Sequence, residues 1–396
     1  VSNKALDAMF KNFKKTLGWT ISSSIVNNLS GSILKAYGYS KKLDKSLNNI
    51  RIVTKQSNEQ MKEFAKYASQ SAAKLAKSTT DYTDAALIYY QQGLADEDVK
   101  ARTDTTLKTA NVTGQSASAV SEQLTAVWNG YKVSANEAEK YVDKLAAVAA
   151  STAADLEELS TGMSKVASAA ATTGVDIDQL SAQMSTIISV TRQAPESVGT
   201  ALKTIYARLG DLDISGNLGD VSGKLRTIGV DVLDASGDLR DMGDIIEEVA
   251  GKWNTMTAAQ KNGVAIAMAG KRQYNNLFAL FENWDMYKSA KETSENSLGE
   301  LQTQQDIFLD SMEAKMQQLS QAGENVIDSL FDIDSVKPFI EGLTDVVNKI
   351  ADFIDVAGGG KKVLLGLSGI LSTMFSKNIG AEANRIANNI KMMYSF

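Results

Sequence analysis

The sequence predicts an all-α protein, organised as a multi-helix bundle with glycine-rich loops. Proline, which interrupts helices from within, occurs only at Pro195 and Pro338 among the 396 residues. Alanine, leucine, lysine and glutamine, which favour helices, fill much of the remaining sequence. The chain is 43% hydrophobic and 22% charged, so it has enough apolar surface for one large core or two smaller ones.

The first region, residues 1–80, is expected to form Lys-rich helices. Within it, Leu43, Leu47, Ile50 and Val53 recur at intervals of three and four residues, the spacing that lines one face of a helix. Core packing is the simplest interpretation of this stripe. A coiled-coil seam with a partner chain would use the same residues.

The second region, residues 81–290, repeats a unit in which an alanine-rich helix ends at a glycine and restarts after a short loop. Three loops show this pattern: 111–117, 130–135 and 173–178. Ser134 and Glu137 have the spacing of a capping box. Small residues and apolar positions at helical spacing predict one continuous helix over 156–171, which either a bundle or a seam between copies would use.

A loop insertion at 210–243 interrupts this region, because glycines and aspartates replace the helical pattern there. At most a small β-hairpin is expected near residues 229–240. Gly229 is expected in a conformation barred to larger residues, and Gly237 fits a turn position with φ above zero.

Helices are predicted to resume after the insertion. Thr257 and Gln260 are placed as a capping box, and 265–280 reads as one apolar helix. Trp253 is expected to anchor the core beside Trp284, Phe278 and Phe281. Lys271 and Arg272, directly after Gly270, could cap preceding carbonyls, pair with the Asp-rich loop or face another subunit.

The third region, residues 291–396, contains a short apolar segment at 362–375. This segment is too short for a spanning helix, which needs about 20 apolar residues. It is interpreted as a buried amphipathic helix, with transient insertion into a target membrane as the alternative.

The composition argues against catalysis and cofactors. The chain contains no cysteine and no histidine, which excludes disulfides, thiolate nucleophiles and histidine relays. The calcium-like opening at Asp211 has Ser222 where the loop needs a glutamate, and Glu247 with Glu248 reads as a solvated acidic pair. No catalytic, cofactor-binding or metal-binding residue is predicted. The net charge of −6, without arginine clusters or aromatic platforms, predicts no specific nucleic-acid binding.

Two runs of sequence carry a resemblance to a known family. The first is 174–209, which starts in TGVDIDQL and ends in GTALKTIYARL. The second is 228–284, with IGVDVLDASGDLRDMGDIIEEVAGKW followed by AGKRQYNNLFALFENW. In this order they resemble the core of tail tape measure proteins from tailed phages and prophages, over about residues 60–290. The candidate structural or interaction residues within these runs are Gly229, Gly237, Arg240, Trp253, Gly270, Lys271 and Arg272.

The resemblance implies a structural scaffold that sets tail length and organises assembly of the tail tip and tube. It further implies release during DNA ejection, a place in the virion after assembly in the host cytoplasm, and contacts with tube, distal tail and baseplate hub proteins. Copies of the chain would surround the tail axis, three by resemblance. Two alternatives stay open: a secreted helical pore-forming or toxin-like protein, and a cell-wall hydrolase that uses carboxylates.

Overall fold

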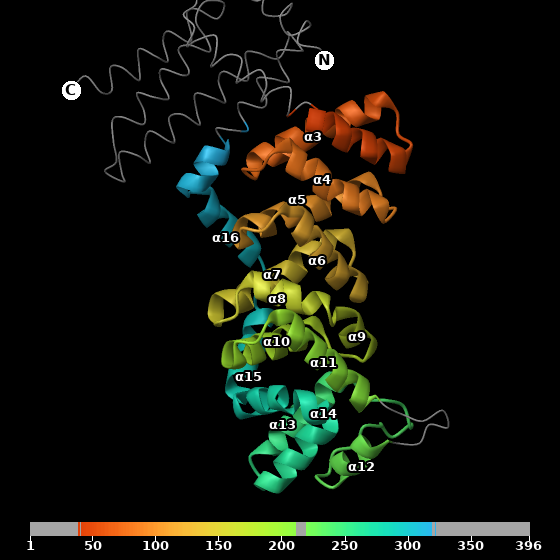
Figure 1. Ribbon diagram of the computed structural model, residues 1–396, viewed down its shortest axis with the longest axis vertical. Coiled ribbons are helices and arrows are strands. Elements are labelled where there is room, and N and C mark those ends of the chain that lie inside the picture. Colours follow the sequence, from red (N-terminus) through yellow and green to blue (C-terminus); the bar gives the residue numbers. More distant parts are fainter. Residues whose placement is uncertain (1–38, 40, 211–218, 319–320, 322–396) are drawn as a thin grey trace, which may run out of the picture.

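The protein is an elongated stack of helices in the computed structural model, which describes residues 39, 41–210, 219–318 and 321 (Figure 1). The all-α prediction is confirmed. Within these described ranges no strand forms, and β-structure is limited to one isolated antiparallel bridge between Leu233 and Leu239. This bridge is the small hairpin expected near residues 229–240.

The upper half of the stack begins with a helix over 41–54. The following elements are α3 (Asn58–Lys74), α4 (Thr79–Gln91), α5 (Asp96–Thr113), α6 (Ala117–Gly130), the 3₁₀ turn η1 (Ala135–Glu137) and α7 (Ala138–Ser151). Each helix lies roughly across the long axis, as the successive layers in Figure 1 show.

The lower half continues the stack and then reverses direction. Its elements are α8 (Leu156–Ser164), α9 (Ala167–Thr172), α10 (Ile177–Thr191), α11 (Pro195–Leu209), α12 (Asp220–Arg226), α13 (Met242–Trp253) and α14 (Ala258–Glu282). The chain then returns along the side of the stack through α15 (Trp284–Glu295) and α16 (Glu300–Leu309). These two return helices pack on α10, α7 and α5.

Local sequence explains where the helices start. A side-chain oxygen before the helix accepts the N3 amide while the N3 side chain accepts the cap amide, which satisfies two otherwise free donors. In the part of the chain that the structure describes, this reciprocal box forms at five starts: Ser57, Ser78, Asp155, Asp176 and Thr257. The Thr257 box is the one that the sequence predicts.

The core consists of two apolar clusters in contact. The upper cluster lies under α3 to α7 and includes Tyr89 and Trp128, whose rings are 6.0 Å apart. The lower cluster extends from α6 to α15. Val112, Tyr131 and Tyr141 pack against both clusters, so the hydrophobic interior is continuous along the stack.

Two predictions about helices are wrong. The continuous helix expected over 156–171 is divided into α8 and α9, because Lys165 and Val166 donate to carbonyls three residues back and tighten the chain there. The capping box expected at Ser134 does not form, since its hydroxyl donates to the side chains of Asn136 and Glu137 instead of accepting a backbone amide.

Several expectations fall outside the described residues. These are the helices of 1–38, the calcium-like run from Asp211 and the apolar segment 362–375. The division of the chain at residues 80 and 290 stays a prediction. No helix in the described ranges is long and apolar enough to cross a membrane.

Candidate interaction region

Gly229 ends the short helix α12 in a left-handed conformation. Its φ is 71°, and its amide donates to the carbonyl of Arg226 while Val230 donates to Leu225, at 2.9 and 3.0 Å. This pair of bonds is the Schellman closure, in which glycine avoids the steric cost of a positive φ. The Gly229 carbonyl accepts from the ammonium of Lys252 on α13, so the turn is tied to the next helix.

Gly237 lies in the turn that joins the two arms of the hairpin, with φ of 88°. One carboxylate oxygen of Asp234 accepts the amides of Ser236 and Asp238, at 2.8 and 3.0 Å. Asp234 also donates its own amide to the carbonyl of Asp238. The turn is therefore held by its own backbone and by one aspartate, as Asx turns are.

Arg240 connects the hairpin to α13. Its guanidinium donates to the carbonyl of Asp231 at 2.6 Å and pairs with Glu248 at 2.9 Å. Lys252 approaches the same Glu248 carboxylate at 3.2 Å. Burial raises the pKa of Glu248, but the bonds from Arg240 and Lys252 outweigh it, and the pKa lies below its ordinary value. Arg240 thus has a positioning role within the chain.

Trp253 is fully buried at the end of α13, where it holds the second half of α14. Its ring lies 5.2 Å from Phe278 and 4.8 Å from Phe281. The indole nitrogen donates to Glu282 at 2.8 Å, and Lys261 pairs with the same carboxylate at 2.8 Å. Burial of this aromatic cluster with its polar edge satisfied fixes the lower end of the stack.

Gly270 bends α14, because its φ of 71° and ψ of 167° are not helical. Beside the bend, the carbonyl of Ala267 accepts from the guanidinium of Arg208 on α11 at 3.0 Å. Capping of a preceding carbonyl, one of the roles expected for Lys271 and Arg272, is therefore performed by Arg208. Lys271 and Arg272 are exposed and form no ion pair with a described residue.

The predicted residues fall into three groups at the lower end of the stack. Gly229, Arg240 and the hairpin meet the outer face of α13, Trp253 lies under α14, and Gly270 with its two basic neighbours lies beside α11. The structure does not gather all seven into one site. Their joint role in contacts with other chains stays a prediction.

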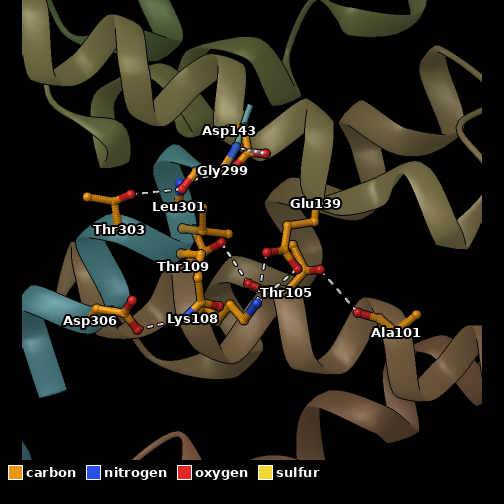
Figure 2. Close-up of polar contacts among 11 residues, drawn as sticks. Ala101, Thr105, Lys108, Thr109, Glu139, Asp143, Gly299, Leu301, Thr303 and Asp306 are labelled. Carbon is orange, nitrogen blue, oxygen red and sulfur yellow. Dashed lines mark hydrogen bonds and ion pairs between the residues drawn. The ribbon is translucent and has the colours of Figure 1, made fainter. Parts of the chain in front are cut away.

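Sequence reasoning missed the acidic residues that hold the return helices. Figure 2 shows Asp143 of α7 at the start of α16, where its carboxylate accepts the amides of Gly299 and Leu301, both at 2.9 Å. Asp143 is only 2% exposed. It satisfies helix-start donors from more than 150 residues away, so no local spacing could have revealed it.

Two further carboxylates hold α15. Asp178 of α10 accepts from Lys144 and from Ser294, both at 2.6 Å. Glu247 of α13 accepts from Tyr287 and Lys291, both at 2.7 Å. The sequence favours a solvated acidic pair at Glu247 and Glu248. That interpretation is wrong, because Glu247 joins α13 to α15.

Close contacts at two glycines join the loop before α10 to the start of α13. A Cβ atom built on Gly174 would lie 1.8 Å from an Asp241 oxygen, and one built on Gly243 would lie 1.9 Å from Gln179. The amide of Met242 donates to Thr173 at 2.9 Å. The loop before α10 and the start of α13 therefore meet at glycine on both sides, which brings Glu247 towards α15.

A cavity of about 350 Å³ lies between α3, α5, η1 and α7. Asp104 in its wall accepts from Tyr82 at 3.0 Å; burial raises its pKa, while hydrogen bonds from Tyr82 and Tyr67 act in the opposite direction. Lys108 pairs with Glu139 at 2.8 Å (Figure 2). Asp104 and Glu139 in the cavity wall therefore both have partners within the chain. Among the described residues no group of acidic side chains is suited to hold a metal ion.

The region that carries these contacts matches a known family. A family model described as phage-related minor tail protein matches residues 58–270, which include every helix from α3 to α13 and more than half of the chain. The chain belongs to the phage-related minor tail protein family. It is therefore a phage tail protein, and this membership suggests that it is a component of the virion. No solved structure matches it.

Within the matched range, the candidate residues described above mainly make contacts inside the chain. Ion pairs of Lys108 with Glu139, Lys144 with Asp178 and Lys291 with Glu247 join different helices. The match ends at Gly270, the residue at which α14 bends. The return helices α15 and α16 lie beyond the matched range and hold it from the side.

Proposed function

We propose that this minor tail protein chain is a portion of a tape measure protein. In this role it acts as a structural scaffold that helps to determine tail length and organises assembly of the tail tip and tube. Release during DNA ejection belongs to the same proposal. The proposed role is structural, without catalysis.

The observation that carries this proposal is the coincidence of two ranges. The family match covers residues 58–270, and the resemblance to tape measure proteins covers about 60–290. The second run of that resemblance builds the hairpin, α13 and α14, in which Arg240 joins the hairpin to α13 and Trp253 joins α13 to α14. The motif therefore has a packing role that a scaffold requires.

The proposed partners are copies of the chain around the tail axis, three by resemblance, together with tube, distal tail and baseplate hub proteins. Assembly would take place in the host cytoplasm. Lys271 and Arg272 are exposed beside the bend in α14, so they are the first positions at which a contact with an acidic neighbouring subunit is expected.

The test is to locate the chain in assembled tails. Phage particles that carry an epitope inserted at the exposed turn near Ser236 are purified, and the tails are imaged with a gold-labelled antibody after mild opening of the tube. Label on the axis at one tail end is expected. Its absence from purified tails, or its presence only on the outer surface, would refute the scaffold role.

A matched pair of variants tests the contact role. Lys271→Glu with Arg272→Glu reverses the two exposed charges, whereas Lys203→Glu with Lys288→Glu reverses two charges at other exposed positions. Tail yield is expected to fall about tenfold or more only for the first pair, a loss of about 1.4 kcal/mol in assembly free energy. Equal yields would show that these two residues do not contact another subunit.

Leakage of dye from liposomes by the purified chain tests the pore-forming alternative. The segment on which that alternative depended, 362–375, lies outside the described residues. Zymography on cell-wall material tests the hydrolase alternative. Neither leakage nor clearing is expected from a scaffold.

A further inference from the structure

We propose that α16 is a latch, which detaches from α5 and α7 while the rest of the stack stays folded. The latch comprises Gly299 and α16, followed by the short helix 312–318. The inference goes beyond the proposed function, because it concerns a movement within one chain. It rests on how the latch is held.

The contact between the latch and the stack is mainly polar. Asp143 accepts the amides of Gly299 and Leu301, Gln304 donates to the carbonyl of Ala146 at 3.1 Å, and Asn111 donates to Gln305 at 3.0 Å. When the latch opens, each of these hydrogen bonds can be replaced by one to water, so each adds little to the free energy that keeps the latch closed.

Apolar burial in the latch is small. α16 buries only Leu301 and Gln305, whereas α10 buries Leu180, Met184 and Ile187 among other residues. In the rest of the latch Ala314 is buried, whereas Ile307 is 69% and Met316 48% exposed. Segments with few buried apolar contacts open more easily than the core to which they are attached.

Closure also leaves buried polar atoms without partners. Asn111 and Gln305 share one hydrogen bond, but the Asn111 Oδ1 and Gln305 Nε2 atoms have none. The Asp143 carboxylate is buried and pairs with no cation among the described residues. The two unpartnered amide atoms would regain hydration on opening, which favours the open state, whereas Asp143 would lose its two backbone donors, which favours closure.

The position of the latch defines what opening would expose. In Figure 1, α16 lies along the side of the upper layers, outside the stack rather than between its helices. Its removal would uncover Asn111 on α5 and Asp143 on α7 and would free Leu301 on the latch. The helices of the two core clusters would remain packed on one another.

Hydrogen exchange of the full-length chain, followed by mass spectrometry under native conditions, tests the proposal. Amides of α16 are expected to exchange at least about tenfold faster than those of α10, because α16 opens without global unfolding. Equal exchange of α16 and α10 in the unaltered chain would overturn the latch.

Three variants show which contacts govern opening. Asp143→Ala removes the acceptor of two latch amides, and about tenfold faster exchange in α16, with α10 unchanged, is expected. Asn111→Leu combined with Gln305→Leu removes the unpaired amide atoms, and slower exchange in α16 is expected. Asp306→Asn, on the outer face where Asp306 bonds only Gln302 among the described residues, is the control and leaves the exchange unchanged. Faster exchange in the double leucine variant, or equal acceleration of α10 and α16 by Asp143→Ala, contradicts the proposal.

Discussion

At the scale of single residues, glycines allow helices from distant parts of the chain to approach closely. A Cβ on Gly199 of α11 would lie 2.3 Å from the Gly162 carbonyl of α8. A Cβ on Gly130 of α6 would lie 2.8 Å from the Ser168 amide of α9. Because backbone atoms stand in these positions, a larger residue would force whole helices apart.

Gly174→Ala is expected to destabilise the protein by about 1 to 3 kcal/mol. The residue has φ of 76°, and the added methyl group would overlap Asp241. Gly251→Ala is the matched control, since this helical glycine has open space around it and alanine there should stabilise the helix by about 0.5 to 1 kcal/mol. Urea unfolding followed by circular dichroism measures both. A neutral Gly174→Ala would show that the loop can move away from α13.

Turn residues were predictable from the sequence, whereas long-range acceptors were not. Gly229 and Gly237 stand between apolar runs in a glycine and aspartate context, and that local chemistry indicates a turn. Asp143 stands in an ordinary amphipathic helix, and its role depends on Gly299, which only the fold brings near. A single sequence contains no signal for such a pair.

At the scale of helices, the starts were easier to predict than the bends. The pattern Thr257 to Gln260 gives a capping box as expected, because both partners lie within one turn. The break at Lys165 comes from a local tightening of the chain, whereas the bend at Gly270 lies beside Arg208 of α11, which donates to the Ala267 carbonyl. Periodicity alone predicts one continuous helix in each case.

The attachment of α15 through Glu247 predicts a pH dependence. Burial raises the pKa of Glu247, but Lys291 and Tyr287 outweigh it, and the pKa is lowered from 4.5. The contribution to stability is therefore present above the unfolded-state value and is lost as the pH falls through the lower folded-state value. Lys291 has a raised pKa, so its own contribution is lost only at alkaline pH, above 10.5.

Glu247→Gln should be less stable than the unaltered chain at pH 7 and should lose less stability between pH 7 and pH 3. Urea midpoints at a series of pH values measure this difference. Asp285→Asn is the control, because Asp285 is exposed and pairs only with Lys288 among the described residues. Parallel pH profiles for Glu247→Gln and the unaltered chain would remove Glu247 from the attachment of α15.

At the scale of the whole molecule, the two core clusters are joined through a few aromatic and aliphatic side chains. Tyr131 packs against both clusters, and its hydroxyl donates to the carbonyl of Val175 at 3.0 Å. Its ring is 6.0 Å from that of Tyr141. Cooperative unfolding of the stack depends on such shared contacts.

Tyr131→Ala is expected to cost about 2 to 3 kcal/mol and to separate thermal unfolding into two transitions. Differential scanning calorimetry of the full chain measures both effects. Tyr274→Ala is the control, because Tyr274 packs only against the lower cluster among the described residues and should leave one transition. A single sharp transition in Tyr131→Ala would show that the clusters are coupled by other contacts.

The hydrogen bond between Gln321 and Thr79 has a consequence for the tape measure role proposed above. It closes a path of 242 residues to a distance of 2.9 Å, so the chain enters and leaves the stack near the same end (Figure 1). A tape measure protein would contribute to tail length only the distance between the points at which its chain enters and leaves this stack. Adding or deleting a complete pair of layers between these two residues would therefore leave tail length unchanged, even in a true tape measure.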